Sequence, residues 1–316
     1  MTRFQSVIST IALASALPVA GIQSATAQDA LSVGVTVVDM GNPFFGAIAT
    51  SVEDAVTKLA GPDAKTLVVS GDYDLARQSN QFDSFIQAGV NLILVSAVDS
   101  QAIGAAVRRA QEAGIPVVAI DNTADGAQAT VTTDNVTAGK QACQYIADRL
   151  EGSGNVLIVN GPQVSGVIDR VTGCKEVFSG YPDIQILSDN QNGIGTRDGG
   201  LEVTTGLLIA HPEVDAIFTI NDPSAIGADL AARQLRRSGI IITTVDGSPD
   251  IEDALKGDTM IEASSAQLPA VLAEAAVAAG IALVNGEAPD NPEILVAPAL
   301  VTRDSVAGYQ GWDSAK

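Results

Sequence analysis

The stretch VDMGNPFF, residues 38–45, joins an apolar run over residues 31–38 to a segment, residues 46–59, whose apolar side chains recur at helical spacing. The two patterns predict a buried strand followed by a helix. Pro43 fits the first turn of that helix, where its missing N–H costs nothing. Asn42 suits either a helix N-cap or a hydrogen bond to a ligand. Phe44 and Phe45 are then either core residues or part of a ligand site, because ligands bind at such turns in open α/β sheets.

The succession of strand and helix continues along the chain in two sets of similar size. The expected strands cover residues 31–38, 66–70, 91–95, 116–120, 129–133, 155–160, 184–187, 216–220, 240–245 and 260–265. The expected helices cover residues 46–59, 75–87, 101–113, 136–150, 170–178, 201–210, 224–236, 251–256 and 271–285. The strands are apolar without clean alternation, which is typical of sheets covered by helices on both faces. The sequence therefore predicts an α/β fold with two similar doubly wound parallel-sheet domains joined near residue 133, and the last helix and the segment 288–299 look like returns across the junction.

Residues 1–27 have the features of a secretory signal peptide. Arg3 precedes an apolar run over residues 7–22, and Ala25-Thr26-Ala27 forms a small-x-small cleavage site. The run is short for a membrane span and contains Pro18 and Gly21, which disfavours a retained anchor. We therefore expect a soluble, exported mature chain that begins after Ala27.

The charge balance excludes some classes of partner. The chain has 17 Lys and Arg against 37 Asp and Glu, a net charge of −20. Nucleic acid and anionic membranes are bound by basic patches, so neither is expected as a partner. An acidic surface otherwise does little more than keep an exported protein soluble.

The chain offers few groups for metal or catalytic chemistry. Its two cysteines are Cys143 and Cys174, and it has one histidine, His211. Export favours a disulfide between the cysteines, and two buried free thiols are the alternative. These three residues do not make a structural zinc site of the usual kind. The sequence lacks a Gly-x-Ser-x-Gly elbow and a phosphate-binding loop, so we expect no cofactor and no catalyst.

Polar side chains follow several of the predicted strands at the point where each strand ends. They are Asn42, Asp121 with Asn122, Asn221 with Asp222, Asp246 and Gln267. Any one of them could be a helix N-cap, and Asp222, followed by Pro223, is expected to be one. Together they come from both halves of the chain and lie at the sheet edge where such folds bind ligands. The pattern favours one shared binding site.

This set of side chains suits the recognition of hydroxyl groups. Carboxylates accept hydrogen bonds from hydroxyls, carboxamides donate and accept, and an aromatic face covers the C–H surface of a sugar ring. Arg170, expected to open a helix, is either the cation of the site or a surface charge. Asp121 and Asp246 could instead be the acid and base of a glycosidase, for which the two-domain pattern is poorly suited.

A series of short motifs makes the chain resemble the ribose-binding-protein branch of the periplasmic sugar-binding proteins, the substrate receptors of ABC importers. The motifs are NPFF at 42–45, IPV at 115–117 leading to Asp121, Asp134-Asn135, Arg170-x-x-Gly173, AHP at 210–212, Asn221-Asp222, DGxPD at 246–250 and AQLP at 266–269. Their order and spacing extend over essentially all of the mature chain.

The resemblance implies a ligand set and two departures from it. The implied set is Asn42, Phe44, Phe45, Asp121, Arg170, Asn221, Asp246 and Gln267, to which we add Asn122. Asn122 stands where the family has an arginine, and the loop at 192–195 lacks the aromatic residue that the family places there. The same recognition of rings and hydroxyls is therefore expected for a ligand other than ribose, either a polyol or another small sugar.

The resemblance also implies a hinge of three segments near Thr133, Gln267 and Pro292. The N-terminal lobe is then 28–132 plus 268–292 and the C-terminal lobe 133–267 plus 293–316. Closure of the hinge traps the ligand, and a permease and an ATPase on separate chains take part in uptake from the periplasm. We expect a monomer. Alternative functions are a receptor of the same fold for another hydroxylated signal such as an autoinducer-like furanose, a receptor that serves chemotaxis, and an exported glycosidase.

Overall fold

The computed structural model describes residues 1–2, 30–287 and 291–313. The predicted signal peptide and its cleavage site fall on residues outside this description, apart from Met1 and Thr2. Among the described helices, none has both the length and the apolar character needed to cross a bilayer.

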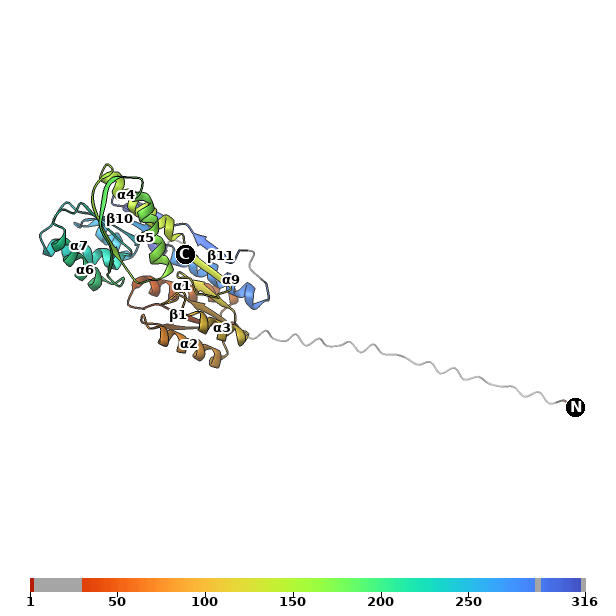
Figure 1. The fold of residues 1–316 in the computed structure, drawn as a ribbon. Coiled ribbons are helices and arrows are strands. Elements are labelled where there is room, and N and C mark those ends of the chain that lie inside the picture. The colour runs from red at the N-terminus through yellow and green to blue at the C-terminus, as the bar shows by residue number, and fades with distance from the viewer. Residues whose placement is uncertain (3–29, 288–290, 314–316) are drawn as a thin grey trace.

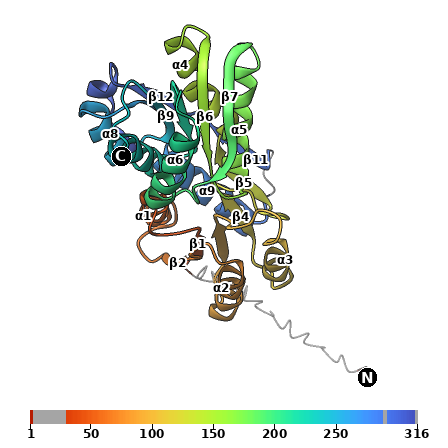
Figure 2. The ribbon, with the colours of Figure 1, turned by 60° about the vertical axis from the view of Figure 1, so that its left-hand side comes forward.

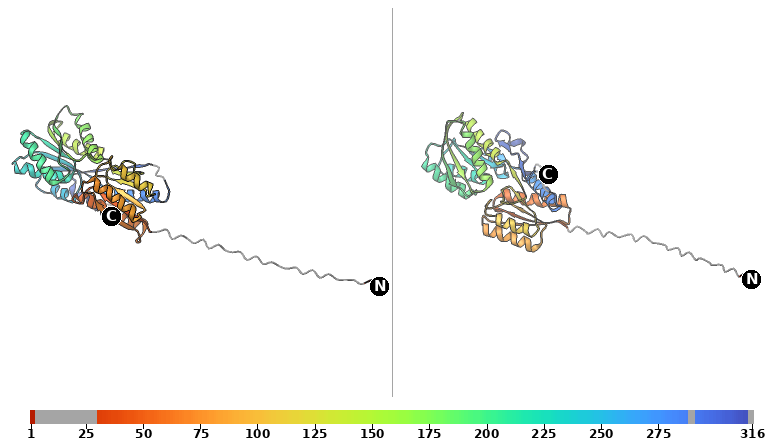
Figure 3. Two further views of the ribbon diagram at one scale, coloured as in Figure 1. Left: turned by 60° about the horizontal axis from the view of Figure 1, so that its bottom comes forward. Right: turned by 45° about the vertical axis from the view of Figure 1, so that its right-hand side comes forward.

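The chain forms two α/β lobes, each built on a six-stranded sheet (Figure 1). In the first sheet the strand order is β2-β1-β3-β4-β5-β11, and all neighbours are parallel. The strands are β1 (Ser32–Val37), β2 (Lys65–Ser70), β3 (Leu92–Val95), β4 (Val117–Ile120), β5 (Ala129–Thr133) and β11 (Glu293–Val296). Helices α1 (Pro43–Ala60) and α9 (Pro269–Val284) pack side by side on one face, while α2 (Leu75–Ala88) and α3 (Gly104–Glu112) cover the other (Figure 3).

The second sheet repeats this order as β7-β6-β8-β9-β10-β12, with only β12 antiparallel to its neighbour among the described strands. The strands are β6 (Ser153–Asn160), β7 (Asp183–Asn192), β8 (Ala216–Thr219), β9 (Ile241–Asp246), β10 (Ile261–Ala266) and β12 (Ala299–Thr302). The helices are α4 (Asn135–Arg149) and α5 (Ser165–Phe178) on one face and α6 (Arg197–Ala210), α7 (Asp222–Gln234) and α8 (Pro249–Lys256) on the other. The predicted fold class is confirmed, and each sheet has the strand-order reversal beside which ligands bind.

The chain passes between the lobes at three places, and Figure 2 shows the lobes one above the other around them. These connections run from β5 to α4, from β10 to α9 and from β11 to β12. The predicted division assigned residues 293–316 to the second lobe, but β11 pairs with β5 in the first sheet, so the last connection lies after Val296. Ile294 and Val296 pack against the core of the first lobe, which fixes β11 there.

Several helices begin earlier than the sequence pattern predicts, α6 among them, at Arg197 rather than 201. Helix α1 begins at Pro43, which confirms that Pro43 lies in its first turn, and the Asn42 side chain caps that turn by accepting a hydrogen bond from the Phe44 amide at 3.0 Å. Helix α5 starts at Ser165 rather than 170, without a capping side chain. Arg170 therefore does not open the helix but lies in its second turn.

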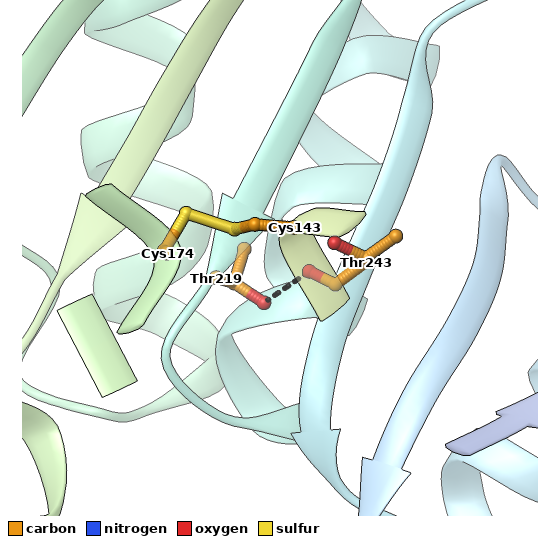
Figure 4. The surroundings of a disulfide bond; sticks show 4 residues. All are labelled: Cys143, Cys174, Thr219 and Thr243. Carbon is orange, nitrogen blue, oxygen red and sulfur yellow. Dashed lines mark hydrogen bonds between the residues drawn. A yellow bond between two sulfur atoms is a disulfide. The ribbon is translucent and has the colours of Figure 1, made fainter. Parts of the chain in front are cut away.

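The two cysteines form a disulfide that joins α4 to α5, with the two Cα atoms 5.1 Å apart. Close packing of these helices requires glycine where they meet: a Cβ at Gly173 would fall on the Val136 carbonyl oxygen. The disulfide lies against β8 and β9, next to Thr219 and Thr243 (Figure 4). Of the two alternatives left open by the sequence, the disulfide is the one present in the structure.

Candidate functional site

A cavity lies between the lobes, where the carboxyl ends of strands from both sheets face each other. All nine residues singled out from the sequence line it: Asn42, Phe44, Phe45, Asp121, Asn122, Arg170, Asn221, Asp246 and Gln267. Most of them lie at or just after the ends of β1, β4, β8, β9 and β10, while Phe44 and Phe45 are in the first turn of α1 and Arg170 is on α5. The structure thus brings the predicted set together, and the ligand-binding role of each residue stays a prediction.

The first lobe supplies an aromatic wall. Phe44 and Phe45 are buried in the first turn of α1, with their ring centroids 5.7 Å apart and nearly edge to face. Asn42 caps that helix with its Oδ1 atom and also lines the cavity. Its side-chain amide nitrogen has no hydrogen-bond partner among the described residues. The cap and the burial of the two rings are confirmed, and binding of a ligand by these residues stays a prediction.

Asp121 is a buried carboxylate on the same lobe, with a side chain only 5 % exposed. Its backbone φ of 67° is in the left-handed region, which aims the side chain away from the path of β4. Ser96 Oγ donates to Oδ2 at 3.4 Å, whereas Oδ1 has no hydrogen-bond partner in the described part of the chain. Burial raises the pKa of Asp121 to about 6, while the Arg170 charge acts in the opposite direction. The free carboxylate oxygen is therefore a costly group that a ligand hydroxyl would satisfy.

Arg170 is held in the second lobe with a charged head that is almost fully buried. Its Nε donates to Asn135 Oδ1 at 2.8 Å, and its Nη1 donates to the Ile220 carbonyl at 2.7 Å. The same nitrogen lies 3.4 Å from Asp246 Oδ1. Nη2 has no hydrogen-bond partner among the described residues, so both N–H groups of this nitrogen remain for a ligand. Of its two predicted roles, the surface charge is wrong.

Asp246 and Gln267 form the far wall of the cavity. Gln267 Nε2 donates to Asp246 Oδ1 at 2.8 Å, and Gln267 Oε1 accepts from the Thr133 hydroxyl of the first connection at 2.7 Å. Burial raises the pKa of Asp246, although Arg170 and Gln267 counteract the shift. Its neighbour Asp222 is also buried, and desolvation together with the Asp246 charge raises the pKa of Asp222 well above its usual value.

Asn221, and not Asp222 as expected, caps helix α7. Its Oδ1 accepts from the Ser224 amide at 3.2 Å, and its Nδ2 donates to the Gly195 carbonyl at 2.8 Å. Asp222 instead accepts from the Ser248 amide at 2.7 Å and holds the loop after β9. The reason is local: Asn221 has extended backbone angles that suit a cap, and Asp222 is already inside the helix.

The lobes touch at the rim of the cavity. The Gly166 amide of the second lobe donates to Asn122 Oδ1 of the first at 3.4 Å, and the Thr123 amide donates to Ser165 Oγ at 3.0 Å. Asn122 therefore bridges the two lobes besides lining the cavity.

Two aromatic residues near the cavity were not among the site residues predicted from the sequence. Tyr73, from the loop between β2 and α2, lines it, and burial together with the charges of Asp39 and Asp246 raises the pKa of its hydroxyl to about 12. Trp312, from the 3₁₀ helix η2 (Gly311–Asp313), packs against Phe44 with ring centroids 5.8 Å apart. Tyr73 follows the predicted strand over residues 66–70, but it is neither a carboxylate nor a carboxamide and so fell outside the pattern that was used, and Trp312 follows no predicted strand.

The arrangement is suited to the recognition of hydroxyl groups. Acceptors stand on both walls, one donor fork lies between them, and phenylalanine rings supply an apolar surface. In the described part of the chain, no group of three or more His, Cys, Asp or Glu side chains is placed to hold a metal ion.

Comparison with known proteins agrees with this geometry. Residues 33–288 match the family model described as a periplasmic binding protein domain. The chain is 32 % identical over 287 residues to the xylitol-binding protein of Mycolicibacterium smegmatis, covering 90 % of this chain and 80 % of that protein. It is 30 % identical to the ribose import binding protein of Bacillus subtilis, covering 81 % and 82 %. A solved ABC transporter solute-binding protein from Actinobacillus succinogenes with bound D-allose superposes with a TM-score of 0.81 at 25 % identity, covering 88 % of this chain and 100 % of that one.

Proposed function

This chain belongs to the periplasmic binding protein family, and on that basis we propose that it captures a small neutral sugar or polyol between its two lobes by hinge closure. It then delivers the ligand to the permease of an ABC importer. The division of the chain into lobes that move about the three connecting segments is part of this proposal.

The observation that carries the proposal is the division of the cavity wall between the lobes. Asp121 stands on one side and Asp246 on the other, with the guanidinium of Arg170 next to Asp246. A ligand bridging the two carboxylates contacts both lobes only when they are closed, so it favours the closed state by its differential affinity. That closed state is what a membrane permease recognises.

The ligand class follows from the chemistry of the lining. The aromatic pair covers a carbon skeleton of limited size, and the acceptors and donors match a molecule with several hydroxyl groups. Two relatives are named for xylitol and for ribose, which are an acyclic and a cyclic five-carbon compound. The loss of the family's arginine at position 122 and of its loop aromatic at 192–195 favours an acyclic polyol over ribose for this chain.

The remaining parts of the proposal concern the setting. The protein acts in the periplasm as a monomer, without a cofactor and without enzymatic turnover, and the permease and ATPase are separate chains. A chemotaxis receptor is a second partner that would recognise the same closed state.

The test is a thermal denaturation screen of residues 28–316 against pentoses, hexoses and linear polyols. A ligand present at 100 times its dissociation constant adds about 2.7 kcal/mol to the folded state. Trp312, the only tryptophan in the sequence, lies near the cavity, so its emission should change with every stabilising ligand. Stabilisation by a furanose signal alone would replace the nutrient role with a signalling one. Hydrolysis of a chromogenic glycoside, or no stabilisation by any compound, would refute the proposal.

A further inference from the structure

The last described residues of the chain reach back to the cavity through two aromatic hydrogen-bond donors. After β12 the chain forms the 3₁₀ helices η1 (Val306–Gly308) and η2 (Gly311–Asp313). The Tyr309 hydroxyl, just after η1, donates to the Gly247 carbonyl at 2.7 Å. Trp312 Nε1, on η2, donates to the Asp246 carbonyl at 2.8 Å. The carbonyls of the last residue of β9 and of the residue after it are therefore both bound by this segment, residues 306–313, which we call the tail. The Asp246 carbonyl also accepts from the Gln267 amide at 3.0 Å.

The dipeptide that accepts these bonds has an unfavourable backbone conformation. Asp246 has a φ of 134°, which few residues other than glycine adopt, and Gly247 has a φ of 71°. A Cβ at position 247 would lie 2.5 Å from the Tyr309 hydroxyl and closer still to Ala266, so only glycine fits under the tail. The Gly247 amide is bound by Ser264 Oγ at 3.0 Å. Such a conformation persists only where its surroundings hold it, and the tail supplies part of that support.

The tail also links the two lobes. Tyr309 packs against the core of the second lobe, whereas Trp312 packs against the core of the first. Helix η2 contacts both α8 of the second lobe and α9 of the first. The ring of Trp312 meets Phe44, a lining residue of the first lobe, at an interplanar angle of 71°. One indole therefore touches the aromatic wall on one side and the backbone of Asp246 on the other.

We propose that Tyr309 and Trp312 are positioning residues that hold Asp246 in its binding conformation and couple it to Phe44. By fixing the carbonyls of residues 246 and 247, they fix the direction in which the Asp246 carboxylate leaves the backbone. That direction brings Oδ1 to Gln267 and Arg170, at 2.8 and 3.4 Å. The claim that this positions Asp246 for a ligand rests on the proposed function. The claim that the tail holds the backbone of residues 246 and 247 does not.

The first experiment measures the backbone without any ligand. Amide hydrogen exchange is followed by mass spectrometry on peptides covering residues 246–249 in the wild type, in Tyr309→Phe and in Trp312→Phe. Each variant keeps an aromatic ring and removes one donor. Tyr145→Phe is the matched control, because its hydroxyl also donates, to Glu262 at 3.1 Å, but on the surface of the second lobe. We expect exchange at the amides of residues 246–248 to be about tenfold faster in the two tail variants and unchanged in the control. Wild-type exchange in both tail variants would overturn the proposal.

The second experiment separates positioning from general support of the fold. Affinities for xylitol and D-ribose and for their monodeoxy analogues are measured by calorimetry in the same four proteins. A further variant, Asp246→Asn, identifies the ligand hydroxyl that Asp246 recognises. Removing that hydroxyl from the ligand should cost less affinity in Asp246→Asn than in the wild type. We expect Trp312→Phe and Tyr309→Phe to weaken binding about tenfold and to reduce discrimination at that hydroxyl alone.

The outcomes of the second experiment are distinct. A uniform loss of affinity for every analogue, or no loss, would overturn the positioning role, since a merely structural effect does not select one hydroxyl. If the wild type binds neither parent compound nor any other member of the screen, the proposed function fails, and the exchange measurement alone decides the role of the tail.

Discussion

Replacing Asp121 with asparagine should stabilise the ligand-free protein while weakening its binding, and the structure gives the size of the first effect. Burial raises the pKa of Asp121 from 3.8 to about 6, a shift of about two units. Each unit corresponds to 1.36 kcal/mol, so ionisation of this group costs the folded state about 3 kcal/mol at neutral pH. Asparagine keeps the acceptor for Ser96 and tolerates the left-handed φ of 67°. The variant removes the cost without adding strain.

The stability difference between Asp121→Asn and the wild type should depend on pH, and its sign tests whether ionisation of Asp121 is the cause. The raised pKa means that the folded protein keeps a proton on Asp121 that the unfolded chain has lost. The wild type therefore has the full contribution of this group below pH 3.8 and loses it as the pH rises to about 6. The stability advantage of Asp121→Asn should be close to zero at pH 4 and about 3 kcal/mol at pH 7.5, which corresponds to a rise in melting temperature of roughly 5 °C.

Thermal denaturation of the ligand-free wild type and variant at pH 4, 5, 6, 7 and 7.5 measures this difference, and calorimetry measures the binding. The amide does not replace a charge-assisted acceptor, so affinity should fall about a hundredfold. In the wild type, affinity should be constant above about pH 6 and fall about tenfold for each unit below it, because only the ionised carboxylate accepts two hydroxyl donors. A variant that is no more stable than the wild type at pH 7.5, or that has the same advantage at pH 4, would refute the reasoning.

Three further changes test other parts of the site and fold. Arg170→Lys should lower affinity at least a hundredfold, because lysine does not reproduce the fork that binds Asn135, and calorimetry should show this while circular dichroism shows an intact fold. Replacing both Cys143 and Cys174 with serine should lower the free energy of unfolding by roughly 3 to 4 kcal/mol in denaturant titrations and leave affinity unchanged, since the bond closes a loop of 31 residues outside the cavity. Tyr73→Phe should lower affinity several-fold with no change in melting temperature, because its hydroxyl has no protein partner among the described residues and only a ligand can use it; wild-type affinity would remove Tyr73 from the site.

The sheets and most of the cavity could be predicted because they depend on local patterns. Apolar runs identify strands, and in a parallel sheet every strand end reaches the same edge, so the position of Asp121 or Asn221 in the sequence already places it. Strands β11 and β12 were missed because each lies at the edge of its sheet, next to proline-containing segments. Such short strands are determined by the sheet edge that they join and not by their own sequence.

Contacts between residues far apart in the sequence could not be predicted from it. Nothing around Trp312 indicates that its indole meets Asp246, which is 66 residues earlier in the sequence. The choice between a disulfide and free thiols also required the packing of α4 on α5. Arg170 was placed mainly by resemblance, because a helix predicted to begin at 170 leaves its side chain as either a site cation or a surface charge.

Ligand-induced closure follows from what the cavity leaves unsatisfied when it is empty. In the structure, the lobes are in contact while Asp121 Oδ1 and Arg170 Nη2 have no hydrogen-bond partner among the described residues. Both residues line the cavity, in which little room is left for water. An empty closed state therefore solvates these two charged groups less well than an open one, in which bulk water reaches both. A polyol supplies hydroxyls that satisfy both atoms at once, so the same ligand removes the cost and holds the lobes together. The pair of unsatisfied charges is therefore the reason that closure should depend on the ligand, and neutralising either one should let the empty protein close more readily even though it binds less tightly.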